Sequence, residues 1–268
     1  QGRPMKTINR IREGADTMKS LVYELEDIFF RIVKNAYPVL WEDAGITRSL
    51  IMDMSAALAD RQMKTPGSQV KMAMRPLMLS GEPESELCSA AILFRISYHD
   101  GQAVQGAALL DAHAKDPGKN SYSSIKKDHL KRLHSVAPRS QLLLYDYDNI
   151  TGMAFPATAE SVLGAYPANW NGWAPFTVAA LAPAHCVIAL NSRDTGLYKA
   201  SLPWSYQLCF RNIYGLDLDF SDAAVDTARG VRSEKGRPRY LVLVSVAHGG
   251  AELDEAFDYD RSAYTGTS

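Results

Sequence analysis

The stretch from Glu82 to Lys115 constrains the fold of this chain more than any other. Two apolar runs flank residues 99–102 (HDGQ), a pattern that predicts two antiparallel strands joined by a tight turn. Successive strand side chains face opposite sides, so Asp111, His113 and Lys115 share one face at the end of the second strand. That strand is rich in Ala, Leu and Val and should be buried. Because buried ionisable groups are costly unless they meet water, a metal or each other, we expect a functional site here.

Composition narrows the class of protein. Hydrophobic residues make up 46% and charged residues 22% of the 268 residues, which is ordinary globular composition. The formal net charge of -1 means that any nucleic-acid surface must be a local patch. The apolar runs are too short for a membrane span, so we expect no membrane association. Three widely spaced cysteines without a CxxC motif predict reduced thiols and a cytoplasmic protein.

Helical periodicity dominates the first sixty residues. Apolar residues at three- and four-residue steps predict one helix over residues 7–37 and a second over 45–62, with Thr47 as the N-cap of the second. Residues 70–79 alternate weakly and predict a strand, which Pro76 should place at an edge or a bend.

The patterns after the hairpin predict further mixed structure. Residues 121–136 predict an amphipathic helix, and residues 141–145 predict a strand parallel to a neighbour, because a helix precedes it. The remaining predictions are strands at 186–190 and 240–246 and helices at 204–215 and 221–229.

The order helix, three strands, helix, strand resembles the core of the PD-(D/E)XK nuclease superfamily, and within it the bacterial restriction- and defence-type members. The resemblance covers residues 17–160. It rests on that order, on the Glu-rich turn of Glu82, Glu84 and Glu86, and on the closing tripeptide 113–115 (HAK). It implies an α/β (α+β) fold in which residues 5–160 form a restriction-endonuclease-like core, with a central mixed β-sheet flanked by helices. Residues 161–268 would be a C-terminal elaboration packed on the same domain.

The resemblance also implies an activity. Such proteins act on DNA in restriction or anti-phage defence, and their acids hold Mg²⁺, which activates the water that hydrolyses a phosphodiester bond. Their Lys orients or deprotonates that water. The catalytic residues implied here are Lys115, Asp111, His113, Glu84 and Glu86. The implied metal ligands are Asp111, Glu84 and Glu86, and an acid of the first helix, Glu24 or Asp27, would be a further donor.

Two departures from the family pattern leave alternatives open. Ala90 or Ala91 stands where an acid is expected, and His113 stands where Glu or Gln is expected. Hard cations prefer oxygen ligands, which Ala does not supply. The site is therefore either rebuilt from Asp111 and the acidic turn, or it is a catalytically degenerate module that binds nucleic acid or a partner protein.

A basic segment follows the hairpin. Residues 115–139 carry seven basic and two acidic residues, which could neutralise phosphates or form an ordinary solvated helix face. The candidate nucleic-acid-binding residues are Lys119, Lys126, Lys127, Lys131 and Arg132. We expect nucleic acid, DNA foremost, as the partner, and a homo-oligomer or a defence-system partner protein stays open.

Other catalytic classes have no marker in the sequence. It contains no GxSxG, HExxH, Walker-type or GxGxxG arrangement. His129 and His134 are five residues apart, a spacing that does not place two metal ligands on one helix face. A Ser-His-Asp site would assemble only in the tertiary structure, and nothing in the sequence nominates its members.

Overall fold

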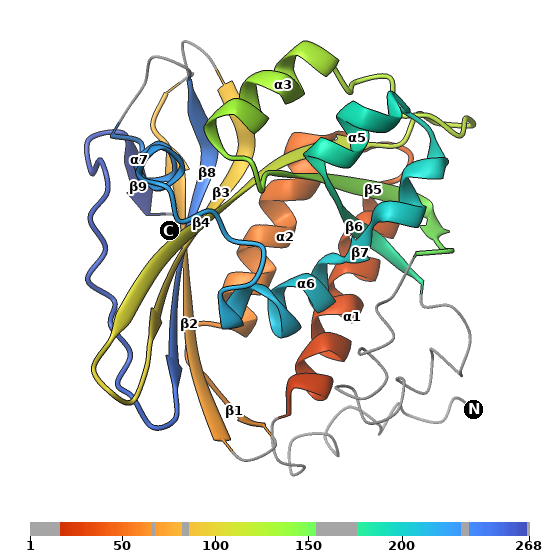
Figure 1. Ribbon diagram of the computed structural model, residues 1–268. Helices are drawn as coiled ribbons and strands as arrows, with labels where there is room; N and C mark the ends of the chain where they lie inside the picture. The colour runs from red at the N-terminus through yellow and green to blue at the C-terminus, as the bar shows by residue number, and fades with distance from the viewer. Residues whose placement is uncertain (1–16, 66–67, 82–85, 154–175, 232–235, 267–268) are drawn as a thin grey trace, which may run out of the picture.

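A single mixed sheet with helices on both faces forms the fold (Figure 1). The computed structural model describes residues 17–65, 68–81, 86–153, 176–231 and 236–266. Within them nine strands run in the order β1-β2-β8-β3-β4-β5-β6-β7, and β9 pairs with β2. The α/β class with a mixed central sheet is confirmed, but a restriction-endonuclease-like core is not established.

The elements have the following bounds. The strands are β1 (Arg61–Thr65), β2 (Ser68–Leu79), β3 (Glu86–Ser97), β4 (Ala103–Ala114), β5 (Gln141–Ile150), β6 (Thr177–Pro183), β7 (Leu202–Pro203), β8 (Arg237–His248) and β9 (Tyr264–Gly266). The α-helices are α1 (Met18–Ala36), α2 (Asp43–Ala57), α3 (Lys127–Val136), α5 (Ala184–Leu190), α6 (Trp204–Phe210) and α7 (Asp222–Ala228). The 3-10 helices are η2 (Thr195–Ala200) and η3 (Asn212–Tyr214).

The predicted hairpin is confirmed. β3 and β4 pair antiparallel, with Ala90 opposite Leu110, and the Tyr98 amide donates to the Gln102 carbonyl across the turn. Gly101 takes a φ of +80°, which the turn requires and which a side chain would oppose. One face of β4 joins the core under α1 and α2, and the other face carries the ionisable residues.

The neighbours of this hairpin in the sheet come from distant parts of the chain. β4 pairs in parallel with β5, as the intervening helix α3 predicted. On the other side, β8 lies between β2 and β3, antiparallel to β2 and parallel to β3 (Figure 1). The strands β2 and β3, consecutive along the chain, therefore do not pair with each other, and the C-terminal hundred residues supply the strand between them.

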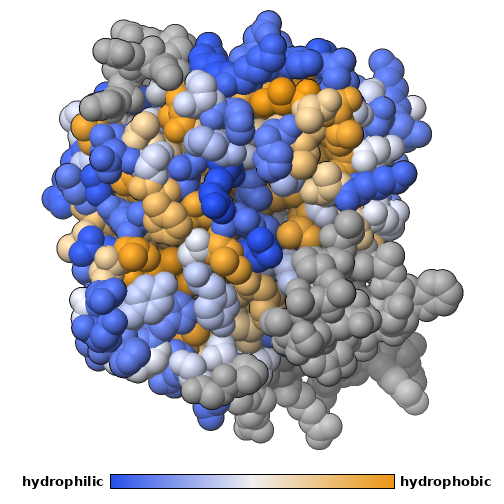
Figure 2. All heavy atoms as spheres, in the orientation of Figure 1, coloured by the Kyte–Doolittle hydropathy of each residue, from blue (hydrophilic) through white to orange (hydrophobic). Residues whose placement is uncertain are grey.

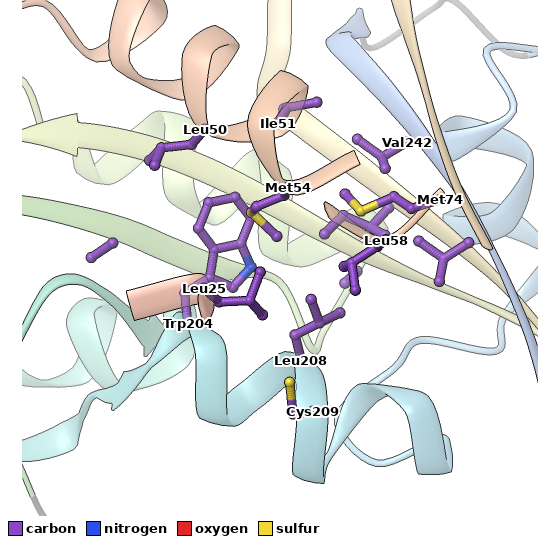
Figure 3. Close-up of a cluster of buried hydrophobic side chains, with 14 of the residues drawn as sticks. Leu25, Leu50, Ile51, Met54, Leu58, Met74, Trp204, Leu208, Cys209 and Val242 are labelled. Atoms are coloured by element: carbon purple, nitrogen blue, oxygen red, sulfur yellow. The ribbon is translucent and has the colours of Figure 1, made fainter. Parts of the chain in front are cut away.

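The main hydrophobic core lies between one face of the sheet and the helices α1, α2 and α6. Figure 3 shows Leu25, Leu50 and Trp204 converging from these three helices. Met74 of β2 and Val242 of β8 close the cluster from the sheet. Each such side chain stabilises the fold by about 1.5–3 kcal/mol relative to an exposed position. The helices fix this side of the sheet, so the ionisable groups of β4 lie on the opposite side.

The opposite face is covered by α3, α5 and α7. Leu133 of α3 packs over the β3–β4 hairpin, and Leu130 packs over β5. Tyr122 and Ile125 are fully buried in the loop before α3 rather than on a helix, because α3 begins at residue 127 and not at 121. These contacts place the start of α3 beside the polar end of β4.

Two predictions near the first helices have different outcomes. The N-cap of α2 is Glu42, and Thr47 lies inside the helix, where its hydroxyl donates to the Asp43 carbonyl and lies 2.8 Å from the Tyr145 hydroxyl. β2 lies inside the sheet, but Pro76 itself is at a local edge, as predicted. β1 pairs with β2 only as far as Met72 and β9 begins to pair at Leu77, so Pro76 pairs with β8 on one side and with no described strand on the other.

Two predictions in the second half have different outcomes. The strand predicted at 186–190 is wrong, since those residues belong to the helix α5; a short apolar run does not distinguish the two. The buried strand at 240–246 is confirmed as β8. No helix in the described ranges is long and apolar enough to cross a membrane.

Candidate functional site

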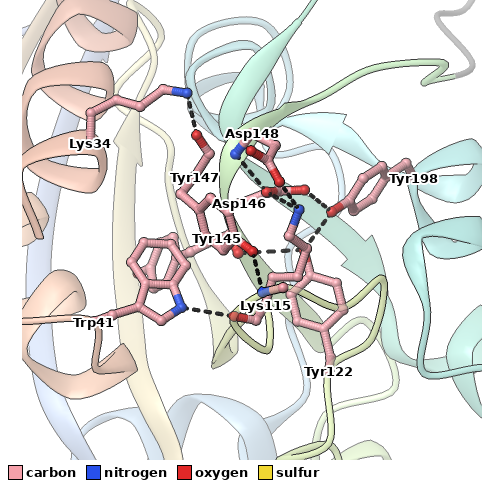
Figure 4. Close-up of polar contacts among 10 residues, drawn as sticks. Lys34, Trp41, Lys115, Tyr122, Tyr145, Asp146, Tyr147, Asp148 and Tyr198 are labelled. Carbon is pink, nitrogen blue, oxygen red and sulfur yellow. Dashed lines mark hydrogen bonds and ion pairs between the residues drawn. The ribbon is translucent and has the colours of Figure 1, made fainter. Parts of the chain in front are cut away.

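Lys115 lies at the end of β4 and pairs with acids from β5. Its Nζ is 2.6 Å from Asp146 Oδ1 and 2.7 Å from Asp148 Oδ2 (Figure 4). Lys115 and Asp146 are 3% and 2% exposed, whereas Asp148 is 66% exposed. Burial lowers the pKa of Lys115, but the hydrogen bonds to the two carboxylates outweigh it and raise that pKa above its usual value. Lys115 is therefore an ammonium ion at neutral pH.

The acceptors around Lys115 are already engaged. Asp146 accepts the Tyr198 hydroxyl at 2.5 Å and the Asp148 amide at 2.7 Å, in addition to Lys115. The indole N–H of Trp41 donates to the Lys115 carbonyl at 2.7 Å (Figure 4). Burial raises the pKa of Tyr198, so its hydroxyl stays protonated. The Lys115 network is a satisfied buried network that joins β4, β5 and η2.

Asp111 and His113 form a second network, farther back on the same face of β4. His113 Nε2 lies 3.0 Å from Asp111 Oδ2, and His129 Nε2 of α3 lies 3.4 Å from the same oxygen. Burial by itself raises the pKa of Asp111, but the hydrogen bonds and charges of the two imidazoles outweigh burial and lower it to about 2. Asp111 is therefore an ionised acceptor at neutral pH.

The second nitrogen of His113 faces a serine. His113 Nδ1 lies 2.9 Å from Ser124 Oγ. Because the Asp111 carboxylate can only accept, His113 Nε2 carries the proton in the neutral ring, and Nδ1 presents its lone pair to the Ser124 hydroxyl. Ser124 is exposed, whereas His113 and Asp111 are buried. Hydroxyl, imidazole and carboxylate thus stand in a line that runs from solvent into the protein.

The acidic turn contributes fewer side chains to the predicted site than expected. Glu86 Oε2 accepts from Arg239 Nε at 2.9 Å, so its nearest partner is a base on β8. Burial first, and then the charges of Asp111 and Glu86, raise the pKa of the Cys88 thiol. Lys115 forms its ion pairs with Asp146 and Asp148 and with neither Glu86 nor Asp111. Glu84 lies outside the described residues.

The donors that the structure describes do not fit a magnesium ion. Mg²⁺ requires a near-octahedral set of oxygen ligands, whereas Asp111 Oδ2 faces two imidazoles and Glu86 is held by Arg239. Glu24 pairs with Arg61 at 2.6 Å, and Asp27 is exposed on α1. In the described ranges no three His, Cys, Asp or Glu side chains are placed to share a metal.

The basic residues lie on α3 and on the loop before it. Lys119, Lys126, Lys131 and Arg132 are exposed. The Lys127 ammonium donates to Asn191 at 3.1 Å, and Arg132 donates to His129 Nδ1 at 2.9 Å. Figure 2 shows hydrophilic side chains along the edge of the molecule where α3 lies. No ion pair with an acid is formed by these five basic residues within the described part of the chain, so no described carboxylate compensates their charges.

No family model matches this sequence, and searches of the curated proteins and of the solved structures found no match. Function must therefore be inferred from the geometry of the two networks and of the basic face.

The arrangement of Ser124, His113 and Asp111 is the feature that the sequence did not reveal. The spacing of Asp111 and His113 on one strand face was visible, and it correctly placed the two side chains together. Nothing local marked Ser124, which lies in a loop with Ser121 and Ser123 close by. Its partner was determined by the way α3 folds back over β4.

Proposed function

We propose that this chain binds nucleic acid through the basic face formed by α3 and the loop before it. The observation that carries the proposal is the exposure of Lys119, Lys126 and Lys131, none of which pairs with an acid of the described chain. An unpaired surface ammonium group is available to a phosphate, and its binding releases a counterion. With a net charge of -1, this local excess distinguishes the face from the rest of the chain.

The first turn of α3 adds to the same face. Lys126 occupies the N-cap position and provides no side-chain hydrogen bond to the helix. The uncapped amides and the helix dipole favour an anion there, although Asp128 in the first turn reduces the effect. The basic side chains and the helix end therefore favour the same kind of ligand, a phosphate group.

Binding without metal-dependent cutting is the version we favour. Asp111 and Glu86, the described members of the predicted ligand set, are held by imidazoles and by Arg239. DNA as the partner, and restriction or anti-phage defence as the setting, are supported by the resemblance in the order of elements alone, and fold likeness is a weak argument for function.

Salt-dependent titration tests the proposal. A fluorescent DNA duplex should bind, and the logarithm of the binding constant should fall linearly with the logarithm of salt between about 50 and 200 mM, with a slope near -0.9 per phosphate neutralised. The triple variant K119Q/K126Q/K131Q should reduce that slope by up to about 3 and weaken binding at least about tenfold.

A matched control removes three positive charges elsewhere. Arg48, Lys64 and Arg75 are exposed on α2, β1 and β2, and R48Q/K64Q/R75Q changes the net charge equally. It should bind like the unmodified protein, and an equal loss in both triple variants would contradict a local binding face. A plasmid-nicking assay with Mg²⁺, with Mn²⁺ and in excess EDTA separates binding from metal-dependent cutting. Nicking that requires the metal ion and is abolished by Asp111→Asn would contradict binding without metal-dependent cutting.

A further inference from the structure

We propose that Ser124, His113 and Asp111 form a metal-independent site in which Ser124 attacks phosphate esters. The inference is independent of nucleic-acid binding. It rests on two contacts, Ser124 Oγ to His113 Nδ1 at 2.9 Å and His113 Nε2 to Asp111 Oδ2 at 3.0 Å. A hydroxyl is a weak nucleophile until a base within hydrogen-bond distance takes its proton, and a third group must orient that base.

The base is held in a single tautomer. Asp111 accepts from His113 Nε2, which leaves the lone pair of Nδ1 for the Ser124 hydroxyl. His129 supports the same carboxylate, because Arg132 donates to His129 Nδ1 and its Nε2–H therefore points to Asp111. A carboxylate with this arrangement also stabilises the imidazolium that forms when His113 takes a proton. Asp111 and His129 are positioning residues, and His113 is the base.

The nucleophile is positioned by the loop that carries it. Tyr122 and Ile125 are buried on either side of Ser124 and anchor the segment. Ser123 Oγ donates to Asp116 at 2.6 Å, as does Ser121 Oγ. Ser124 differs from both neighbours because its hydroxyl faces an imidazole and not a carboxylate. Ser123 is therefore a natural control, an adjacent exposed serine without an imidazole.

The surroundings favour an anionic ester. Lys126 follows Ser124 by two residues and is exposed, whereas the Lys127 ammonium is engaged by Asn191. The first turn of α3 has no side-chain cap, although it carries Asp128. Ammonium groups and uncapped helix amides stabilise phosphoryl oxygens and the charge that develops on them in the transition state. A phosphodiester fits these surroundings better than a neutral ester.

The reaction balances without a cofactor. Ser124 Oγ forms a bond to phosphorus while its proton moves to His113 Nδ1. The bond from phosphorus to the leaving oxygen breaks, and the imidazolium returns the proton to that oxygen, which leaves as an alcohol. Water then attacks the phosphoserine ester, with His113 again taking the proton, and Ser124 is restored; nothing is oxidised or reduced.

The test uses the full chain in excess EDTA with two probes. A fluorophosphonate should label Ser124, located by peptide mass spectrometry, and bis(4-nitrophenyl) phosphate should be hydrolysed with release of nitrophenol. Ser124→Ala should abolish labelling, and His113→Gln should slow it about 100-fold or more, the usual contribution of a general base. Ser123→Ala should label at the original rate.

Three results would overturn the inference: no labelling at all, labelling unchanged in Ser124→Ala, or labelling at Ser124 unchanged in His113→Gln. Urea unfolding of each variant shows whether it folds. If His113→Gln does not fold, Ser124→Ala still tests the inference, because Ser124 is exposed and its substitution should not disturb the fold. Failure of labelling with DNA binding intact would refute this inference and leave the proposed function standing.

Discussion

The ammonium nitrogen of Lys115 lies 2.6 Å from Asp146 Oδ1, and both side chains are almost completely buried. Removing one partner of a buried ion pair leaves the other charge without compensation, and the usual cost is about 3–5 kcal/mol. Lys115 is therefore expected to hold β4 and β5 together, whatever else it does.

Lys115→Met should lower the free energy of unfolding by about 3 kcal/mol, because the buried Asp146 carboxylate loses its cation. Urea unfolding at neutral pH measures the change. Adding Asp146→Asn to this variant should recover part of the loss, since the uncompensated charge is gone. Lys126→Met, at an exposed position, should change the free energy by less than about 0.5 kcal/mol. Equal effects at the two lysines would contradict a structural role for the Lys115 pair.

Glu26 of α1 should make the protein less stable as the pH rises. The carboxyl accepts from Ser205 and from Thr177, and burial outweighs these hydrogen bonds and raises its pKa from 4.5 to about 7. The folded state thus retains a proton that the unfolded state has lost between pH 4.5 and 7. The contribution of Glu26 to the free energy of unfolding is complete below pH 4.5 and is lost as the pH rises through 7. The whole change is about 3 kcal/mol.

Glu26→Gln keeps the shape and cannot ionise. It should be more stable than the unmodified protein at pH 8, and the difference between the two should shrink toward pH 5. Urea unfolding at several pH values measures both curves. Asp27→Asn, on the exposed side of the same helix, is the control and should leave the pH dependence unchanged. Parallel curves for Glu26→Gln and the unmodified protein would show that Glu26 does not hold the proton.

Asp111 should have the opposite dependence. Its pKa is lowered from 3.8 to about 2, so the folded state has lost a proton that the unfolded state keeps between these values. The contribution of Asp111 to the free energy of unfolding is present above pH 4 and is lost as the pH falls to 2. The whole change is about 2 kcal/mol. Asp111→Asn should remove this component from the acid unfolding curve. If stability falls with pH below 4 in the same way in both proteins, the hydrogen bonds assigned to Asp111 are contradicted.

Leu50 of the main core and the exposed Leu40 form a matched pair for substitution. Leu50 is 0% exposed and Leu40 is 71% exposed. Leu50→Ala should cost about 2–5 kcal/mol, the range for a buried leucine that leaves a cavity, and Leu40→Ala should stay within about 0.5 kcal/mol. The change in the urea midpoint of each variant, at an unchanged dependence of the unfolding free energy on urea concentration, gives both values. A small loss at Leu50 would mean that the helices close over the gap.

Much of the local structure was predictable. The β3–β4 hairpin, the first helix and the buried strand at 240–246 follow from patterns that span a few residues. The position of β8 between β2 and β3 did not follow, because the choice of a strand partner across well over a hundred residues depends on the shapes of all the packed faces. The run at 186–190 failed for a different reason, since its length suits either a strand or a helix.

The candidate site divides in the same way. The sequence alone determined that Asp111, His113 and Lys115 share one face of a buried strand, because side-chain direction alternates with every residue whatever the strand packs against. Only the tertiary structure decided which groups they meet: Lys115 the acids of β5, and His113 the hydroxyl of Ser124. Those partners come from a neighbouring strand and a folded-back loop, and their positions depend on how the sheet and α3 pack together rather than on any local pattern.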